Sequence, residues 1–391
     1  MGNECEGGEG FRDAAPFDLA AGAHRLTIYA AGEDRRRALF ALIDGAERTL
    51  DLCFYIFATD ASGRAVREAL VRAAGRGVAV RLMLDGFGAD ADAAFFAELC
   101  AAGGKFHCFS PKWTQRYLIR NHQKMVIADG TRAMFGGFNI EDSYFAPPAD
   151  DGWNDMAIAL KGPAVPGLQE WFDGLFRWAR DERPKFLRLR RQVRAWDWSD
   201  GTARWLIGGP SRGLSSWARC VREDLRAGRR LDMVMAYFSP SNRALRRVGR
   251  IARLGDTRLV MAAKSDNNAT LGATRSLYDY LLRKGAAVYE FQPCKLHTKL
   301  IVIDDAVYLG SANFDVRSLY LNLELMLRIE DAAVAERMRA FVRGHIDASE
   351  RITPELHRQR ATLWNRVRWN LGWLLVTVVD YTVTRRLNLG L

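Results

Sequence analysis

Cysteine pairs of the kind that bind zinc or form a disulfide framework are missing from this chain. Six cysteines occur in 391 residues, but none forms a C-x-x-C pair or lies near histidines at zinc-ligand spacing. A carboxylate cluster of the metal-site type is not visible either. The sequence therefore predicts reduced thiols, no metal site and no cofactor.

Long apolar runs are also lacking. No stretch approaches the roughly 18 to 20 uninterrupted apolar residues that a membrane-spanning helix needs, and Asp380 interrupts the longest candidate. Residues 1–22 show neither the basic segment nor the apolar core of a secretory signal. We therefore expect a protein of the cell membrane that binds peripherally or at the interface, on the cytoplasmic side.

The composition excludes disorder and fibrous repeats, because 49% of the residues are hydrophobic and 26% are charged. Acidic residues are outnumbered, and the formal net charge is +11. A basic balance favours an anionic partner, and by charge alone nucleic acid and an anionic membrane surface fit equally well.

Two halves of the chain follow the same order of strands and helices, which predicts an α/β fold built by internal duplication. In the first half we expect a strand at 26–30, a helix carrying Leu39, Leu42 and Ile43, a strand at 49–57, a helix at 63–76 and a buried strand at 78–85. In the second half we expect strands at 203–208, 231–238, 257–263 and 286–291, with helices at 214–227, 244–254 and 277–285.

The predicted division has a first domain at 25–180, a basic linker at 181–202, a second domain at 203–345 and a C-terminal helix at 362–391. Pro184 and Gly201 interrupt regular structure in the linker. Its basic run is either a solvated face or a phosphate-binding patch made by Arg188, Arg190, Arg191 and Arg194.

A His-x-Lys-x4-Asp motif occurs twice, as His122/Lys124/Asp129 and as His297/Lys299/Asp304. Side chains two apart on a strand point to the same face, so each His and Lys can reach one ligand. The Asp of each motif comes five residues after the Lys, at the far end of the strand. We therefore expect Asp129 and Asp304 to support the site without touching substrate.

A glycine-containing return follows each motif strand and brings Asn139 and Asn313 back toward the histidines. Two Lys would supply positive charge for a phosphodiester, while the two Asn and the Ser311 hydroxyl would donate hydrogen bonds to its oxygens. One His would attack phosphorus and the other would move the proton of the leaving or incoming alcohol.

A single His on a strand is usually structural, and that is the alternative for each copy of the motif. Duplication with matched Lys, Asp and Asn partners favours catalysis. The other four histidines lack such partners, and we expect them to be incidental: His24, His107, His345 and His357.

The paired motifs resemble those of the phospholipase D superfamily over residues 25–345, and more closely bacterial cardiolipin synthases of the phospholipase D type. The supporting stretches include the GGFN return, the YFSP segment and the run GSANFDVRSLYLNLE. The resemblance implies two α-β-α sandwich halves related by a pseudo-twofold axis. It also implies that Glu324 steadies a motif histidine and that Asp155 is its counterpart in the first half.

The resemblance has one asymmetry, because Gly137 stands where the second half has Ser311. A hydroxyl is therefore expected on one side only. The superfamily usually uses the N-terminal histidine as the nucleophile, so the resemblance favours His122 for attack and His297 for proton transfer.

The end of the chain predicts an amphipathic helix with apolar residues at helical spacing, namely Trp364, Val367, Leu371, Leu374, Leu375 and Val378. Arginines and tryptophans along its edges suit a bilayer interface. The alternative is a terminal helix packed on the protein's own core.

Together these features predict a phosphatidyltransferase that makes cardiolipin from phosphatidylglycerol and a second phospholipid through a phosphatidyl-histidine. The expected partners are phospholipids and the membrane surface, and no nucleic acid. The closest alternative is a phospholipase D that hydrolyses headgroups. A metal-independent nuclease and a non-catalytic membrane scaffold are more distant alternatives.

Overall fold

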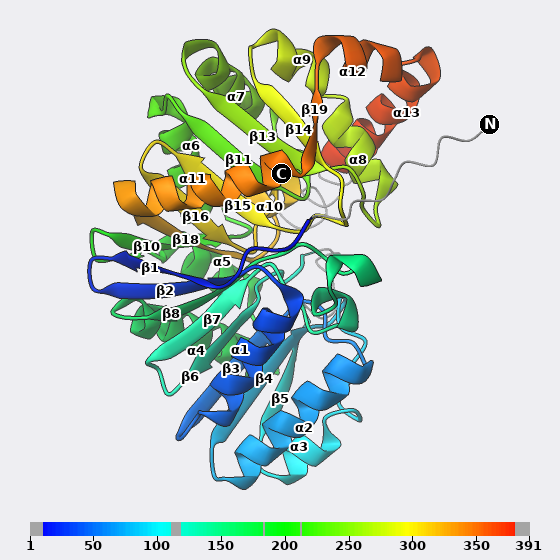
Figure 1. Ribbon diagram of the computed structural model, residues 1–391. Coiled ribbons are helices and arrows are strands. Elements are labelled where there is room, and N and C mark those ends of the chain that lie inside the picture. Colours follow the sequence, from blue (N-terminus) through cyan, green and yellow to red (C-terminus); the bar gives the residue numbers. More distant parts are fainter. Residues whose placement is uncertain (1–10, 111–118, 183, 212, 380–391) are drawn as a thin grey trace, which may run out of the picture.

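The computed structural model describes residues 11–110, 119–182, 184–211 and 213–379 (Figure 1). Two mixed sheets, each covered by helices, stack on one another. The predicted α/β fold of two similar halves is confirmed.

The first half holds strands β1 to β8 and helices α1 to α4. Its strands are β1 (Phe17–Ala21), β2 (His24–Tyr29), β3 (Thr49–Phe54), β4 (Ala79–Asp85), β5 (Lys105–Phe109), β6 (Met125–Ala128), β7 (Arg132–Gly136) and β8 (Ala157–Lys161). Its helices are α1 (Gly32–Asp44), α2 (Ala61–Gly75), α3 (Ala97–Ala101) and α4 (Ala164–Arg180), with short 3-10 turns at Asp142–Tyr144 and Pro148–Asp150.

The second half holds strands β9 to β19 and helices α6 to α11. Its strands are β9 (Trp198–Ser199), β10 (Ala203–Gly208), β11 (Leu231–Met235), β12 (Phe238–Ser239), β13 (Thr257–Ala262), β14 (Ala287–Phe291), β15 (Lys299–Ile303), β16 (Ala306–Gly310), β17 (Phe314–Asp315), β18 (Glu324–Glu330) and β19 (Ser349–Ile352). Its helices are α6 (Ser216–Ala227), α7 (Asn242–Leu254), α8 (Asn268–Arg275), α9 (Tyr278–Arg283), α10 (Val316–Tyr320) and α11 (Ala332–Asp347).

The strand orders of the two large sheets show the duplication directly. The first sheet runs β5-β4-β3-β6-β7-β8-β2-β1, and the second runs β14-β13-β11-β15-β16-β18-β10-β9 with β19 added beyond β14. The central strand of the first sheet, β3, pairs parallel to β4, and that of the second, β11, pairs parallel to β13; both pair antiparallel to the motif strand of their own half. Both central strands are almost wholly buried, as expected of apolar strands covered on both faces.

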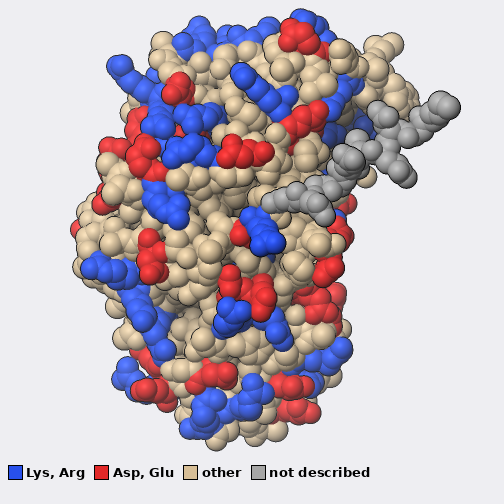
Figure 2. Space-filling model, viewed as in Figure 1, with Lys and Arg blue, Asp and Glu red and all other residues tan. Residues whose placement is uncertain are grey.

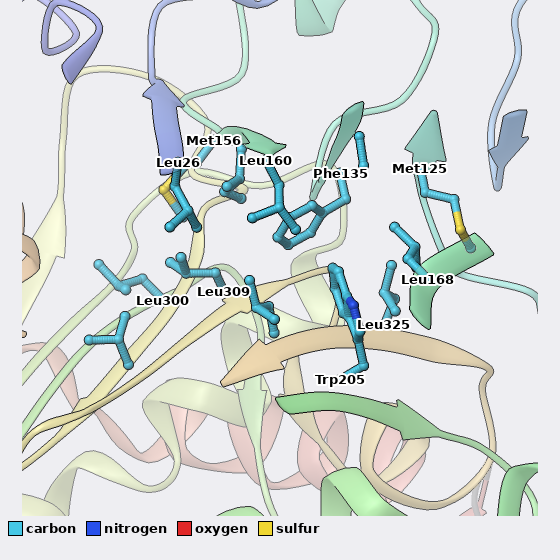
Figure 3. Close-up of a cluster of buried hydrophobic side chains, with 14 of the residues drawn as sticks. Leu26, Met125, Phe135, Met156, Leu160, Leu168, Trp205, Leu300, Leu309 and Leu325 are labelled. Carbon is cyan, nitrogen blue, oxygen red and sulfur yellow. The ribbon is translucent and has the colours of Figure 1, made fainter. Parts of the chain in front are cut away.

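The two halves share one apolar core. Figure 3 shows side chains of the first half, such as Phe135 and Leu160, facing side chains of the second, such as Trp205 and Leu309. The rings of Phe135 and Trp205 lie 5.0 Å apart, edge to face. A large apolar interface of this kind fixes two domains relative to one another. A site assembled from both halves therefore has a rigid base.

The segment predicted as a linker contains helix α5 (Phe186–Ala195). Phe186, Leu189 and Val193 of this helix are buried in the shared core. Three arginines of the basic run lie on its exposed side, namely Arg188, Arg191 and Arg194. Over the face in Figure 2, basic and acidic side chains are interspersed rather than gathered into one stripe.

The C-terminal segment forms α12 (Pro354–Arg360) and α13 (Leu363–Trp373), followed by a π-helical turn at Leu374–Val379. Helix α13 packs on α8, and both lie at one end of the second half (Figure 1). Trp369 is buried there and its ring stacks on His357 at 5.6 Å. Residues 380–391 of the predicted helix lie outside the described residues.

The same helix and the π-helical turn after it leave a row of large apolar side chains exposed, namely Leu363, Trp364, Val367, Leu371, Leu374 and Leu375. Trp364 is 74% exposed and Leu363 is 82% exposed. Helix α13 therefore combines one packed face with one uncovered apolar face. None of the helices in the described ranges is long and apolar enough to cross a bilayer.

Candidate active site

The two motif histidines meet at the junction of the halves. Each precedes its motif strand and bonds through its backbone N–H to the opposite half: His122 to the Leu323 carbonyl at 2.9 Å, and His297 to the Asn154 carbonyl at 2.7 Å. Isolated bridges between Asn121 and Leu323 and between Asn154 and Leu296 surround these bonds. The backbone of each half thus positions the histidine of the other.

The two carboxylates are exchanged between the halves in the same way. Nδ1 of His122 lies 3.0 Å from Oε2 of Glu324, and Nδ1 of His297 lies 2.7 Å from Oδ2 of Asp155. Both acids are fully buried. A carboxylate on Nδ1 fixes the tautomer and leaves Nε2 as the reactive nitrogen. The sequence identified both acids but did not show that each serves the histidine of the other half.

Burial favours the neutral form of both imidazoles. It lowers the pKa of His297 to about 3, and the nearby Lys299 adds to this effect although Asp155 opposes it. Burial also lowers the pKa of His122, opposed by Glu324. Burial raises the pKa of Asp155, but His297 and Lys299 outweigh it, so the pKa of that carboxyl is lowered. A neutral imidazole is the form that can attack phosphorus.

Both motif lysines are buried. Lys124 donates to the His122 carbonyl at 2.7 Å, and Lys299 donates to the His297 carbonyl. Burial lowers the pKa of Lys124 to about 7 and that of Lys299 to about 8, and the like charge of Lys299 adds to the shift of Lys124. An anion bound between them would reverse the shift, because it favours both charged forms. Among the described residues no group of three or more His, Cys, Asp or Glu is placed to hold a metal.

Asp129 and Asp304 lie away from the histidines, at the turns that follow β6 and β15. Both have left-handed backbone conformations, with φ of 57° and 47°. Asp129 accepts backbone N–H bonds from 47–49, including one of 2.7 Å from Arg48. Asp304 accepts the equivalent bonds from 229–230. These contacts give both residues a role in holding the turn.

The returns after the motif strands place Asn139, Ser311 and Asn313 in the buried interior. Oδ1 of Asn139 accepts the Ile56 N–H at 3.1 Å, whereas Oδ1 of Asn313 has no hydrogen-bond partner among the described residues. A buried polar atom without a partner is unusual and suits a group that awaits a ligand.

Ser311 and Gly137 occupy equivalent positions but act differently. Ser311 donates to Glu324 at 2.6 Å and accepts the Leu325 N–H at 3.0 Å. A Cβ at Gly137 would lie 2.4 Å from Oδ1 of Asp155, so no side chain fits there. The shorter acid of the first half therefore requires glycine, and the longer acid of the second half is held by a hydroxyl.

Several residues around His297 were not predicted from the sequence. The Tyr144 hydroxyl lies 3.5 Å from Nε2 of His297, and the Tyr144 and Trp153 rings lie 5.2 and 5.3 Å from the imidazole. The fully buried Arg35 holds this loop by donating to the carbonyls of Tyr144 at 2.7 Å, Trp153 at 3.1 Å and Asp155 at 2.6 Å. Tyr144 and Trp153 lie in the sequence between Asn139 and Asp155, two residues already assigned to the site. That position was the only sequence feature that we find to indicate a place near His297.

His345, expected to be incidental, takes part in the support of the site. Its Nε2 lies 3.0 Å from Oδ1 of Asn154, and Asn154 in turn donates to Asp13 at 2.7 Å. The Asn154 carbonyl is the one that accepts the His297 N–H. His345 therefore braces the segment that carries Asp155.

Comparisons with known proteins identify the family of this chain. A family model described as cardiolipin synthase, phospholipase D-like domain, matches residues 39–176 and 224–345. Cardiolipin synthase A of Pseudomonas entomophila (strain L48) is 30% identical over 334 residues, covering 83% of this chain and 69% of that protein. The major cardiolipin synthase of Bacillus subtilis (strain 168) is 31% identical over 363 residues, covering 89% and 74%.

Among solved structures, the phosphatidylserine synthase of Haemophilus influenzae Rd KW20 aligns with a TM-score of 0.70 at 12% identity, covering 93% of this chain and 97% of that chain. A polyphosphate kinase from Porphyromonas gingivalis aligns with a TM-score of 0.54 at 13% identity, covering 82% of this chain and 50% of that one. At these identities both structures support the fold alone. The family model and the two relatives, together with the paired motifs, show that this chain belongs to the cardiolipin synthase family with phospholipase D-like domains.

Proposed function

We propose that this protein is a phosphatidyltransferase that makes cardiolipin from phosphatidylglycerol and a second phospholipid. The observation that carries the proposal is the crosswise site, in which each half supplies one histidine and the carboxylate that orients the other. Two buried lysines, one from each motif, provide charge for one phosphodiester. Membership of the cardiolipin synthase family directs this chemistry to phospholipid.

The first step forms a phosphatidyl-histidine. Nε2 of one imidazole attacks phosphorus, the bond from phosphorus to the headgroup oxygen breaks, and the second imidazole, as imidazolium, gives its proton to the departing alcohol. The bound phosphate favours that imidazolium, because a nearby anion stabilises the charged form. Proton transfer of this kind typically contributes about 10² to 10⁴ in rate.

The second step transfers the phosphatidyl group. The now neutral second imidazole takes the proton of a phosphatidylglycerol hydroxyl, the hydroxyl oxygen attacks phosphorus, and the phosphorus–nitrogen bond breaks. Lys124, Lys299, Asn139, Asn313 and the Tyr144 hydroxyl lie where they can stabilise the oxygens of the transition state. Water in place of the hydroxyl would give hydrolysis by the same steps.

Membrane contact follows from the exposed apolar row of α13. Leucine, valine and tryptophan side chains on one face, beside Arg366 and Arg368, suit insertion among headgroups. We propose peripheral binding through this face, with phospholipid and the membrane surface as partners and without nucleic acid. Protease accessibility in cells with a permeabilised outer layer tests the predicted cytoplasmic side.

The test of the function is lipid mass spectrometry in a host without its own cardiolipin synthase. Cells expressing the parent protein should accumulate cardiolipin, and cells expressing His297→Ala should not. Accumulation of phosphatidic acid alone would identify a hydrolase. An unchanged lipid profile together with cleavage of DNA by the purified protein would replace the lipid assignment by a nuclease. Equal cardiolipin from parent and His297→Ala would contradict the catalytic role of the site.

A further inference from the structure

Two neighbouring cavities lie where helix α13 packs on the second half. The first, which we call the basic cavity, has a volume of about 330 Å³ and is lined by residues of α8, β14, α12 and α13. The second, the apolar cavity, measures about 420 Å³ and lies between α8 and α13, with Leu271 and Leu375 in its wall. Arg275, Arg368 and Trp369 line both cavities. A polar cavity thus adjoins an apolar one.

Four cationic side chains and two carboxylates line the basic cavity. Both carboxylates are already paired: Nε of Arg275 donates to Oε1 of Glu290 at 2.8 Å, and Arg360 donates to Glu350 at 2.7 Å. His357 also lines the cavity, and burial lowers its pKa, which favours the neutral imidazole. Two of the four cations therefore offset the two acids.

The other two cations of the basic cavity are Lys264 and Arg368, and both are exposed. Nζ of Lys264 makes one long hydrogen bond, of 3.4 Å, to the Pro293 carbonyl. Within the described part of the chain Lys264 has no ion pair, and the Arg368 guanidinium has neither an ion pair nor a hydrogen bond. Two uncompensated positive charges at one cavity favour an anionic ligand.

Arg368 also lies within the exposed apolar row of α13. Trp364 precedes it by four residues and Leu371 follows it by three, and side chains at these spacings are neighbours on a helix. The Leu371 side chain lines the apolar cavity. Arg368 therefore marks the boundary between a basic and an apolar surface. A phospholipid has the same order of parts, because its charged phosphate is followed by acyl chains.

Close packing of α8 and α13 fixes the walls of the apolar cavity. A Cβ at Gly372 would lie 2.8 Å from the Ala269 carbonyl oxygen, and one at Gly272 would lie 3.4 Å from Cα of Trp369. Both glycines thus allow the two helices to approach closely. Because the walls are already in place, a ligand would bind with little cost of ordering the protein.

Helix α8 connects these cavities to the active site. The Thr274 hydroxyl of α8 donates to the Phe238 carbonyl of β12 at 3.1 Å. Phe238 pairs with Phe314 of β17, directly after Asn313. A lipid held at α8 and α13 would therefore keep this edge of the active site close to the bilayer.

We propose that the two cavities together bind one anionic phospholipid of the bilayer, with its phosphate at Lys264 and Arg368 and an acyl chain between α8 and α13. Basic pockets beside membrane-bound helices suit anionic headgroups, and each cavity is large enough for part of such a ligand. The inference goes beyond the proposed function, because this lipid is bound without being converted. It gives the exposed row of α13 a preference for anionic over zwitterionic lipid.

The test is photo-crosslinking of the full chain on phosphatidylcholine vesicles. The vesicles contain a small fraction of phosphatidylglycerol with a diazirine in one acyl chain, and peptide mass spectrometry locates the adducts. The chain carries His297→Ala, so that the probe is not consumed. We expect adducts in α8 and α13. Arg368→Gln and Lys264→Gln should each reduce these adducts about tenfold, since a charge-assisted contact to phosphate is lost.

Arg366→Gln is the matched control. Arg366 lies on the same helix but lines neither cavity, and it pairs with Asp279 at 3.2 Å. Its replacement removes the same charge and should leave the adducts within about twofold of the parent level. Arg368→Lys should retain part of the labelling, because it keeps the charge. Unchanged melting temperatures, and unchanged turnover of soluble dihexanoyl phosphatidylglycerol by chains with His297 intact, would show that the fold is preserved.

Three results would overturn the inference: adducts confined to the active site, equal labelling of α8 and α13 in Arg368→Gln and its parent, or equal labelling by a phosphatidylcholine probe. The labelling needs no turnover. A parent chain that is labelled at α8 and α13 but makes no cardiolipin would therefore overturn the proposed function and leave this lipid site standing.

Discussion

The two halves have the same strand order and the same motif, yet they hold their histidines differently. In the first half His122 takes a long acid, Glu324, which Ser311 supports. In the second half His297 takes a short acid, Asp155, at 2.7 Å, and two aromatic rings flank its imidazole. A duplicated framework has thus produced two unequal environments for the motif histidines.

From this difference we infer that duplication placed the two histidines at equivalent positions in the fold. The residues around each histidine would then determine its role in the reaction. An attacking imidazole and a proton-transferring imidazole need different surroundings, because one must stay neutral and the other must cycle its proton.

The largest expected effect comes from the exchanged carboxylates. Asp155→Asn and Glu324→Gln should each lower kcat by about 10² to 10⁴, because an imidazole without its carboxylate loses its tautomer and orientation. The double variant should be little worse than either single variant, since both acids serve one reaction. Rates of cardiolipin formation from phosphatidylglycerol check this. Halves that worked independently would instead leave about half of the activity in each single variant.

A smaller effect on kcat is expected when the residues beside those acids, Gly137 and Ser311, are each replaced by the residue of the other half. Gly137→Ser should lower kcat by about 10² or more, because the added Cβ displaces Asp155 from His297. Ser311→Gly should cost only about tenfold, since it removes one hydrogen bond to Glu324. Equal losses in the two variants would show that the halves are interchangeable at this position. Melting temperatures serve as the control for folding.

The two motif lysines should make the activity depend on pH. Both pKa values are lowered, to about 7 for Lys124 and about 8 for Lys299, so each lysine is charged below that pH and neutral above it. Since a charged lysine is needed to bind phosphate, kcat/KM should fall about tenfold per pH unit above pH 8. In Lys299→Gln the pKa of Lys124 should rise, because the like charge that lowers it is gone. A flat profile from pH 7 to 10, typical of ordinary lysines, would contradict these shifts.

The smallest effect on chemistry is expected at the motif aspartates, where the halves should behave alike. Asp129→Ala and Asp304→Ala each remove backbone acceptors and place alanine in a left-handed conformation. The free energy of unfolding should fall by about 1 to 3 kcal/mol in urea titrations. Activity of the folded variants should stay within a few-fold of the parent. A loss above a hundredfold at unchanged stability would place these residues in the reaction.

Much of the fold was predictable because the strands carry their own signal. The apolar run at 49–57 and the strand at 203–208 were identified from β-forming residues, and β3 and β10 lie there. Helix α5 was missed because its sequence is dominated by arginines, and its three core residues had no visible partner until both sheets were assembled.

The site was predictable as a list of residues but not as an arrangement. His122, His297, Asp155 and Glu324 could be named from the duplication and the resemblance. Their crosswise pairing joins residues 202 and 142 positions apart, and no local pattern encodes a contact of that range. Arg35 was missed for the same reason, because its partners are backbone carbonyls of a distant loop and carry no side-chain signature.

The central claim is that two histidines in different surroundings act on the same phosphorus atom. The most direct test uses a phospholipid donor with a nitrophenol leaving group. Nitrophenolate leaves without being protonated. The variant that lacks the proton-transferring histidine should therefore release one equivalent of nitrophenol. The phosphatidyl group should then stay on the other histidine. The resemblance assigns that behaviour to His297→Asn, with the adduct on His122, and predicts no release from His122→Asn. Peptide mass spectrometry locates the adduct. Full turnover by either variant, or adducts in both, would contradict a shared site with divided roles.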